Sequence, residues 1–335
     1  MDDLVTVFGG SGFVGNNVVR MLARDGWRIR VAVRNPHLAE RVRVHGVVGQ
    51  IQPMAANVRS PDSVARALDG AVACINLAAV FYERNRQKFG AVHVGGARNV
   101  ATAAAAQGIE RFVHMSGIGA SPDSTSRYAR SRGEGEAVVR ELMPTATILR
   151  PSVIFGTEDA FFNRFGAMAA VAPALPLIGG GHTRFAPVYV GDVARAATVA
   201  LSLPAARGRI YELGGPRAYS FRELMEVVLR ETGRKRPLVP LPFFAASALG
   251  TVGDIAGAVL KVAAPFLRFT PPITKDQVEL LKQDNLPNPA YPGLSDLGIT
   301  PVAAEGLIGS YLYRYRKAGQ FSTLEPEKSA SGANP

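Results

Sequence analysis

The feature that limits the fold of this 335-residue chain most strongly is a set of three glycines spaced three residues apart. They lie between a short apolar run and a helix-like segment. The apolar run Leu4-Val5-Thr6-Val7-Phe8 is typical of a buried strand, and residues 17–25 repeat apolar side chains at helical spacing. A turn between them needs positive φ, a backbone bare enough for a pyrophosphate, and close helix–strand packing. Free N–H groups at the helix start would then hold phosphates. We therefore expect a dinucleotide to contact Gly9, Gly10, Ser11, Gly12, Phe13, Val14 and Gly15.

Strand-like and helix-like segments alternate through residue 150. Near-continuous apolar strands between helices are typical of a parallel sheet covered on both faces. The sequence thus predicts an α/β fold, with a doubly wound parallel Rossmann sheet over residues 1–150. Beyond Arg150-Pro151 the pattern loosens into glycine- and proline-rich loops, although Ser220 and Glu223 are spaced as a helix capping box. We expect a smaller C-terminal α/β lobe over 151–317, with some segments returning to the Rossmann sheet, and a disordered tail over 318–335.

Composition narrows the function classes. Hydrophobic residues make up 47% and charged residues 19%, as in folded globular proteins. The single Cys74 excludes a disulfide within the chain and reads as a small core residue. The first residues carry no signal-peptide or transit-peptide pattern, which favours the cytoplasmic side of a bacterium or an already trimmed chain. The net charge of +11 suits an acidic membrane surface or protein partner, whereas no nucleic-acid-binding motif is present.

The apolar segment of the second lobe that runs from Val252 to Phe266 is consistent with two interpretations. It is interrupted by charged residues, so it is a poor spanning helix. Its apolar residues instead form a stripe at spacings of three and four, which either packs on its own lobe or docks on a partner or the membrane interface. We expect docking through this stripe: Val252, Ile255, Val259, Val262 and Phe266.

The end of the second strand indicates which dinucleotide binds. An NAD site places a carboxylate there for the ribose 2′-hydroxyl, and that carboxylate would repel a 2′-phosphate. This chain has Val33-Arg34-Asn35, and Arg34 is suited to pair with a phosphate. The sequence therefore predicts NADP(H), with NADPH as the expected form, and no metal site. Further cofactor contacts are expected at the ends of later strands and in the catalytic region, from Asn57, Val58, Leu77, Ala78, Ala79, Tyr128, Arg132 and Pro151.

Three residues form a candidate catalytic group. Ser116 ends a predicted strand, and Tyr128 and Arg132 lie four apart on a predicted helix, so they share one face. In active dinucleotide-dependent dehydrogenases that use such a group, the tyrosine transfers a proton, the serine holds the substrate oxygen, and a lysine lowers the pKa of the tyrosine. Arginine stands at the lysine position here, keeping the charge but changing the donor geometry. The residues leave catalysis open.

Longer segments carry a more specific resemblance. The chain resembles the atypical short-chain dehydrogenase/reductase family, and within it the NADPH-binding accessory subunits of respiratory complex I and their alphaproteobacterial relatives. The match extends to about Phe321. Beyond the glycine turn, it includes the segments Ile148-Leu149-Arg150-Pro151-Ser152-Val153-Ile154-Phe155-Gly156, Asp159-Ala160-Phe161-Phe162-Asn163-Arg164-Phe165, Leu175-Pro176-Leu177-Ile178-Gly179-Gly180-Gly181, Pro187-Val188-Tyr189-Val190-Gly191-Asp192-Val193-Ala194, Tyr211-Glu212-Leu213-Gly214-Gly215-Pro216 and Thr274-Lys275-Asp276-Gln277-Val278.

The resemblance implies a tightly held, structural NADP(H) and little or no turnover. It also implies docking on the peripheral arm of complex I beside the membrane, at the cytoplasmic face of a bacterial inner membrane or the equivalent matrix face, rather than an evident homo-oligomer. The departures from the family pattern are Arg132 for lysine, Ala79 for glycine and Asn57 for aspartate. Two alternatives remain: an active NADP-dependent reductase or epimerase using Tyr128 and Ser116, or a free dinucleotide-binding regulator.

Overall fold

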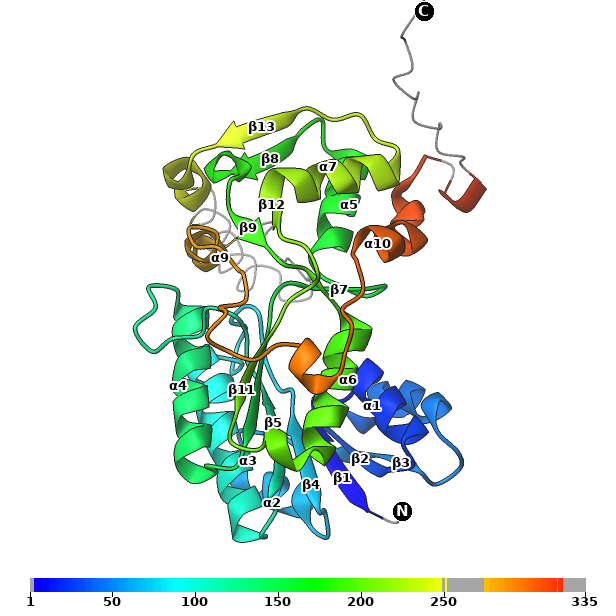
Figure 1. The fold of residues 1–335 in the computed structure, drawn as a ribbon, viewed down its shortest axis with the longest axis vertical. Helices are drawn as coiled ribbons and strands as arrows, with labels where there is room; N and C mark the ends of the chain where they lie inside the picture. The colour runs from blue at the N-terminus through cyan, green and yellow to red at the C-terminus, as the bar shows by residue number, and fades with distance from the viewer. Residues whose placement is uncertain (1–2, 249–250, 252–273, 318, 322–335) are drawn as a thin grey trace, which may run out of the picture.

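A computed structural model of the chain describes residues 3–248, 251, 274–317 and 319–321. Its main sheet has seven parallel strands in the order β11-β6-β5-β4-β1-β2-β3 (Figure 1). After β3 the chain crosses back to lay β4 on the other side of β1, and such a reversal opens a crevice at the carboxyl ends of the strands. The predicted doubly wound Rossmann sheet is confirmed. Its strands are β1 (Leu4–Phe8), β2 (Arg28–Val33), β3 (Ile51–Ala55), β4 (Ala73–Asn76), β5 (Arg111–Met115), β6 (Thr147–Pro151) and β11 (Ile210–Leu213).

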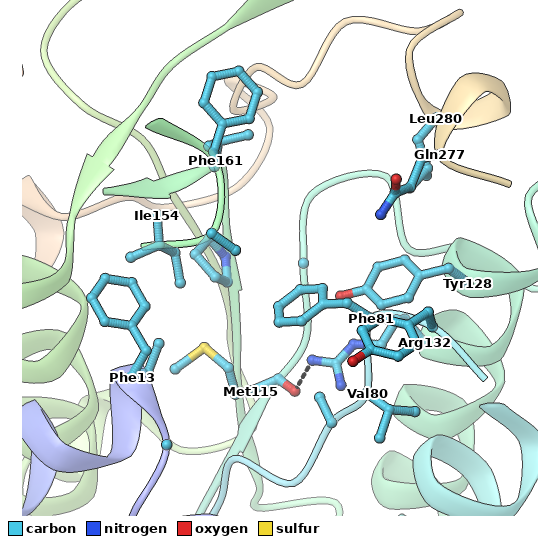
Figure 2. A pocket seen from close by; sticks show the side chains of 18 of the residues that line it. Phe13, Val80, Phe81, Met115, Tyr128, Arg132, Ile154, Phe161, Gln277 and Leu280 are labelled. Carbon is cyan, nitrogen blue, oxygen red and sulfur yellow. Dashed lines mark hydrogen bonds between the residues drawn. The ribbon is translucent and has the colours of Figure 1, made fainter. Parts of the chain in front are cut away.

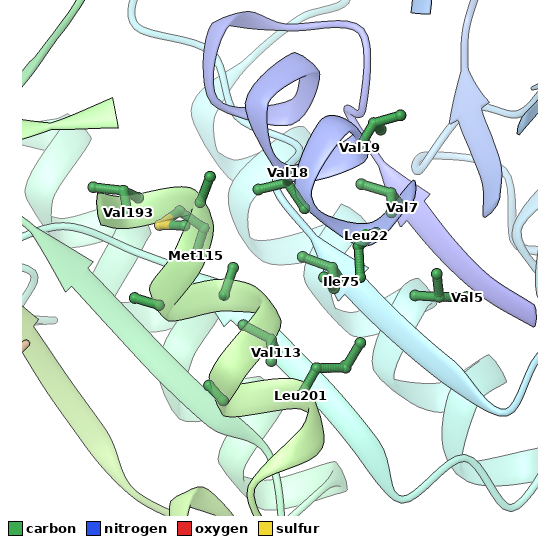
Figure 3. Close-up of a cluster of buried hydrophobic side chains, with 14 of the residues drawn as sticks. Val5, Val7, Val18, Val19, Leu22, Ile75, Val113, Met115, Val193 and Leu201 are labelled. Carbon is green, nitrogen blue, oxygen red and sulfur yellow. The ribbon is translucent and has the colours of Figure 1, made fainter. Parts of the chain in front are cut away.

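Helices cover both faces of this sheet. One face carries α1 (Phe13–Arg24) and α6 (Val190–Ser202), and the other carries α2 (Pro61–Leu68), α3 (Gly95–Ala106) and α4 (Arg127–Leu142) (Figure 1). Successive side chains of a strand point to opposite faces, so each strand feeds two cores. Val5 and Val7 pack with α1 and α6 (Figure 3). Phe8 instead packs with α2 and α3. Cys74 is fully buried in the second core, and burial raises the pKa of its thiol, so the structure confirms a core cysteine.

A second lobe lies above the carboxyl ends of the strands (Figure 1). Its core centres on Phe155, Phe162, Phe221, Leu224 and Ile308. Its described residues include the helices α5 (Phe162–Val171), α7 (Phe221–Thr232), α9 (Lys275–Leu280) and α10 (Glu305–Leu312), and residues 243–248 are also helical. Its paired strands are β7 (Ile154–Phe155) with β10 (Val188–Tyr189), β8 (Leu175–Ile178) with β13 (Leu238–Leu241), and β9 (Arg184–Phe185) with β12 (Tyr219–Ser220).

Local signals agree with the observed ends of the helices. Gly26 has a φ of +82° directly after the cap of α1, and the predicted capping box between Ser220 and Glu223 opens α7. Helix α1 begins at Phe13, earlier than its apolar pattern, because the last part of the glycine turn is already helical. The stripe from Val252 to Phe266 and the tail after 321 lie outside the described residues. In the part of the chain that is described, no helix has the length and apolarity to cross a bilayer.

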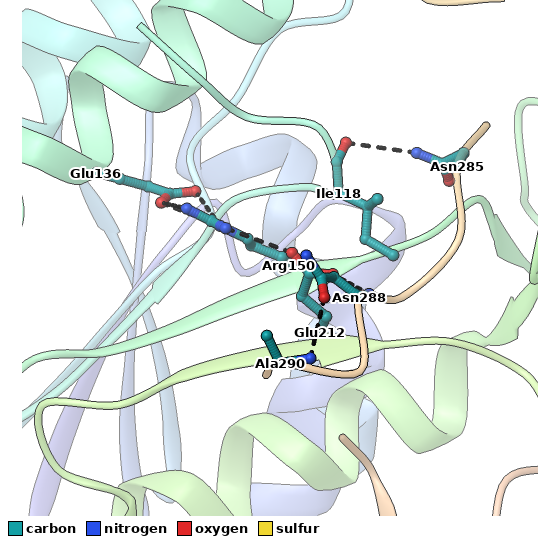
Figure 4. A network of polar contacts seen from close by, with 7 residues as sticks. All are labelled: Ile118, Glu136, Arg150, Glu212, Asn285, Asn288 and Ala290. Carbon is teal, nitrogen blue, oxygen red and sulfur yellow. Dashed lines mark hydrogen bonds and ion pairs between the residues drawn. The ribbon is translucent and has the colours of Figure 1, made fainter. Parts of the chain in front are cut away.

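A buried ion network fastens the two lobes beside the crevice (Figure 4). Arg150 on β6 lies 2.6 Å from a Glu136 oxygen on α4 and 3.3 Å from a Glu212 oxygen on β11. The other Glu212 oxygen accepts from the backbone N–H of Asn288 at 2.7 Å, and the Arg150 guanidinium lies over the Tyr291 ring. Burial alone would lower the pKa of Arg150, but the hydrogen bonds and charge of its partners raise it. The network thus holds the chain segment after α9 against the sheet.

Candidate functional site

The glycine turn is closed tightly over the start of α1. Gly9 has a φ of +79°, and a Cβ there would lie 3.2 Å from the backbone of Leu77. A Cβ on Gly15 would lie 2.2 Å from the Gly9 carbonyl oxygen, so only glycine lets the helix pack on the turn. Helix α1 has no side-chain N-cap and no acidic residue in its first turn. Its first N–H groups are therefore available to an anion such as a pyrophosphate.

The end of β2 presents positive charge and no carboxylate to the same crevice. Arg34 is exposed and lines it together with Asn35 and Leu38. Arg41, from the 3-10 segment after β2, donates to the Ser11 carbonyl oxygen at 3.0 Å, which brings a second guanidinium to the glycine turn. The acidic residues that line the crevice, of which Glu158 is the first along the chain, all belong to the second lobe. This end is therefore suited to a phosphate.

Two buried histidines hold the loop that follows β4. The Asn76 side-chain oxygen accepts from the Ala78 N–H at 3.2 Å, so the Asn76 amide donates to Nδ1 of His114, also at 3.2 Å. Val80 N–H donates to Nε2 of His93 at 3.0 Å. Each histidine thus accepts through an unprotonated ring nitrogen. Burial, followed by the charge of Arg132, lowers both of their pKa values to about 3.

His93 also connects this loop to the start of α4. Because its Nε2 accepts from Val80, its Nδ1 carries the proton and donates to Ser131 Oγ at 2.8 Å. Ser131 in turn donates to the Tyr128 carbonyl oxygen at 2.8 Å. The Tyr128 ring meets His93 edge-on, with centroids 5.5 Å apart, and stacks on Phe81 at 5.9 Å. The position of Tyr128 is therefore set by neutral partners on two sides.

Ser116, Tyr128 and Arg132 all line the crevice. Figure 2 shows Tyr128 and Arg132 near Met115 at its floor. Arg132 is 4% exposed, and its guanidinium donates to the Met115 carbonyl oxygen. Within the described chain no carboxylate lies at ion-pair distance from Arg132, and neither its Nε nor the buried Ser116 hydroxyl has a hydrogen-bond partner. Leaving a buried cation and a buried hydroxyl unpaired is costly. Both groups are consequently suited to the oxygens of a bound molecule.

These elements enclose one cavity of about 1420 Å3 between the lobes. It brings together the predicted site residues except Gly10, which is buried against the side chains of Val7, Val19 and Val31. The predicted residues on its walls are Gly9, Ser11, Gly12, Phe13, Val14, Gly15, Arg34, Asn57, Val58, Leu77, Ala78, Ala79, Ser116, Tyr128, Arg132 and Pro151. Ligand pockets usually measure about 300–1,000 Å3, so there is room for a dinucleotide and a second molecule.

Sequence reasoning missed Arg41, His93 and the residues of α9. Arg41 lies in a 3-10 segment without a motif, 30 residues from its partner Ser11. His93 lies in a stretch of small residues that resembles ordinary helix. On α9, Asp276 accepts from the backbone N–H groups of Arg127 at 2.6 Å and Tyr128 at 3.0 Å, capping α4 from the second lobe. An acidic residue at a helix N-terminus is a familiar signal, but its helix is 148 residues away.

Comparisons with known proteins agree with this geometry. A protein of Arabidopsis thaliana, mitochondrial NADH dehydrogenase (ubiquinone) 1 alpha subcomplex subunit 9, is 36% identical over 97% of this chain and 81% of its own. The Caulobacter vibrioides protein named ceramide reductase is 34% identical over 71% of this chain and 74% of its own. UDP-glucose 4-epimerase of Thermus thermophilus, solved with NAD, superposes with a TM-score of 0.66 at 20% identity, covering 94% and 99% of the two chains.

The resemblance predicted from the sequence is therefore confirmed, since a relative named as a complex I subunit matches nearly the whole chain. Residues 5–214 match the family described as the NAD dependent epimerase/dehydratase family, which supports a nucleotide cofactor in this cavity. That range contains every site residue predicted from the sequence. The chain belongs to the NAD dependent epimerase/dehydratase family.

Proposed function

We propose that this chain is an accessory subunit of respiratory complex I that holds NADP(H) as a structural or regulatory cofactor. The observation that carries the proposal is Arg132. Its guanidinium is buried and tied to the Met115 carbonyl oxygen, at the position where an active dehydrogenase has a lysine beside the tyrosine. A guanidinium spreads its charge over a planar fork and does not exchange protons, unlike a compact ammonium. The site therefore retains Tyr128 and the groups that bind a cofactor, while the cation beside the tyrosine is altered.

The residues of the cavity fit NADP(H) from end to end. The first N–H groups of α1 would hold the pyrophosphate, and Arg34 with Arg41 would pair with the 2′-phosphate. Asn57 and Val58 lie where the adenine would rest, and Leu77, Ala78 and Ala79 let the backbone approach. Arg132, whose Nε has no partner within the described chain, and Tyr128 would receive the nicotinamide-ribose end. When bound, the cofactor supplies hydride chemistry.

Its partners would be subunits of the peripheral arm and the adjoining membrane surface. The similarity to a relative named as a complex I subunit supports the first, and the net charge of +11 favours a site beside anionic headgroups. Each Lys or Arg near such a surface contributes about 1 kcal/mol. The protein would lie peripherally on the cytoplasmic face of a bacterial inner membrane, or on the matrix face in mitochondria.

A second candidate function is NADP-dependent reduction of a carbonyl. It is favoured by the presence of Ser116 and Tyr128 in the lining of one cavity, and by the relative named ceramide reductase. In this reaction Ser116 would hold the carbonyl oxygen and Tyr128 would donate a proton to it.

Cofactor choice is tested by exchanging charge at the end of β2. Arg34→Asp should weaken NADPH binding at least tenfold, about 1.4 kcal/mol, because a charge-assisted pair is lost and a repulsion is added. It should leave NADH binding unchanged. Arg28→Asp is the matched control, because Arg28 is exposed at the opposite end of the same strand. Calorimetric titration of both variants and extraction of the bound nucleotide from the wild type give the readout. Mostly NAD in the extract would contradict the assignment.

The subunit assignment and the reductase alternative have separate tests. Native electrophoresis of gently solubilised membranes should show the protein migrating with complex I and carrying NADP(H). A protein that remains entirely free of complex I would refute the subunit assignment.

Steady-state oxidation of NADPH with carbonyl substrates should be absent or very slow. If turnover is found and disappears in Tyr128→Phe, the reductase replaces the structural-cofactor role.

A further inference from the structure

The cavity continues from the nucleotide cradle into a chamber of the second lobe, and this chamber differs in chemistry from the rest. Its walls are aromatic and aliphatic side chains of α5, α7, β8, β13 and α9. We call these residues the chamber: Phe161, Phe165, Met168, Ile178, Phe221, Leu241 and Leu280. Figure 2 shows Phe161 and Leu280 above the floor formed by Met115, Tyr128 and Arg132. A ligand in this space would meet mostly hydrocarbon.

Polar side chains also line the chamber and its rim, and most of them are paired within the protein. Arg164 donates to the Gln277 side-chain oxygen at 3.4 Å, whereas Glu158 and Gln283 are exposed to solvent. Asp284 pairs with Arg184 at 2.8 Å, and Asn285 accepts from Ser152 at 2.7 Å through its side-chain oxygen. Glu279 pairs with Lys282 at 2.7 Å. A sugar needs many free donors and acceptors around it, and this rim supplies few. The structure therefore disfavours a hydroxyl-rich ligand here.

Unsatisfied polar groups occur instead at the chamber floor. Among the described residues, neither the buried Ser116 hydroxyl nor the buried Arg132 Nε has a partner, and both residues line the cavity together with Tyr128. Apolar walls with a few convergent polar groups at one end are suited to a ligand with an apolar body and an oxygen-bearing head. Met168 and the leucines have flexible side chains, which adapt to a chain that is itself flexible.

The side chains at the mouth of the cavity also favour a ligand with an apolar body. Phe81 is 67% exposed and Tyr82 40% exposed, although both line the cavity. Phe81 stacks on Tyr128, so its exposed ring extends the apolar wall outward from the floor. Large apolar side chains left open beside a cavity often mark a binding surface.

We propose that the chamber binds a long-chain fatty-acyl compound, with its chain between α5 and α9 and its head oxygen beside Ser116 and Tyr128. The proposal goes beyond the subunit function and does not depend on it, because described residues of this chain alone supply the chamber walls.

The test measures binding to the full-length protein saturated with NADPH. The probe is cis-parinaric acid, a fluorescent long-chain fatty acid, kept below its critical micelle concentration. It should bind saturably, and hexadecanoic acid should displace it far more effectively than octanoic acid. Each methylene that enters the chamber is expected to tighten binding about fourfold. UDP-glucose should not displace it.

Two variants and a matched control locate the binding. Met168→Glu and Leu280→Glu place a carboxylate on opposite walls of the chamber, and each should weaken the probe at least tenfold. Val171→Glu is the control, because Val171 lies on the same helix as Met168 but is 85% exposed and does not line the cavity. Retained NADPH shows that each variant is folded. Leu280→Glu covers the case in which Met168→Glu fails to fold, since Leu280 is 36% exposed.

Three outcomes would overturn the proposal: no saturable probe binding by the NADPH-loaded protein, wild-type affinity in both folded chamber variants, or displacement by UDP-glucose at lower concentration than by hexadecanoic acid. Loss of NADPH binding itself would instead contradict the proposed cofactor role, so the two failures are distinguishable.

Discussion

Mild acid should destabilise this protein through His93 and His114. Both are almost fully buried, at 2% and 3% exposure, and both accept a hydrogen bond at a ring nitrogen. Their folded-state pKa values of about 3 lie below the usual value of 6.5, because burial and Arg132 disfavour the charged form. A lowered folded-state pKa means that protons bind the unfolded chain more tightly. The stabilisation is therefore complete above pH 6.5 and is lost as the pH falls toward 3.

The size of this effect follows from the two shifts. One pKa unit corresponds to about 1.36 kcal/mol for each proton. Between pH 7 and pH 5 each histidine should lower the free energy of unfolding by ~2 kcal/mol, and the pair by ~4 kcal/mol. The same histidines fix the backbone of Ala78 and Val80 at the cavity wall, the first through Asn76. Acid should consequently release the nucleotide before the protein unfolds globally.

Urea unfolding followed by circular dichroism at several pH values measures the loss. His93→Gln and His114→Asn each retain an acceptor near the original ring nitrogen without a titrating group, so the double variant should lack most of the acid sensitivity. His37→Gln is the control, because His37 is exposed. Burial also lowers the pKa of His45, so His45→Gln is measured alongside. An unchanged pH dependence in the double variant would refute the reasoning.

Three further substitutions test the fold. Arg150→Met should lower the free energy of unfolding by about 3–5 kcal/mol, because it leaves the buried carboxylates of Glu136 and Glu212 without their cation. Urea unfolding should show much of that loss recovered when both glutamates are also replaced by leucine, and no recovery would contradict the charge argument. Gly15→Ala should weaken NADPH binding in calorimetric titration, because the added Cβ would lie 2.2 Å from a backbone oxygen and displace α1 from the turn. Wild-type affinity would rule out this clash. Ser220→Ala should cost about 1 kcal/mol in thermal or urea unfolding by removing the cap of α7, and an unchanged midpoint would show that the capping box contributes little.

The sequence alone determined the elements that depend on neighbouring residues. Gly9, Gly12 and Gly15 identify the phosphate turn because the steric demands of that turn fall within seven residues. Ser220 and Glu223 mark the start of α7 for the same reason, since a capping box spans one helical turn. The place of Arg34 followed from its position directly after an apolar strand. The alternation of apolar strand-like segments with helix-like segments was sufficient to predict the Rossmann sheet.

Only the tertiary structure decided which distant residues meet at the site. His93 and Ser131 are 38 residues apart, and Asp276 caps a helix that begins nearly 150 residues earlier. An apolar pattern reports that a face is buried, but it does not say whether that face fills a core or lines a cavity. Phe162 and Phe165 illustrate this, since both lie on α5 but the first fills the core and the second lines the chamber. Their difference arises from the side of α5 that faces the other lobe, which no local property of the sequence records.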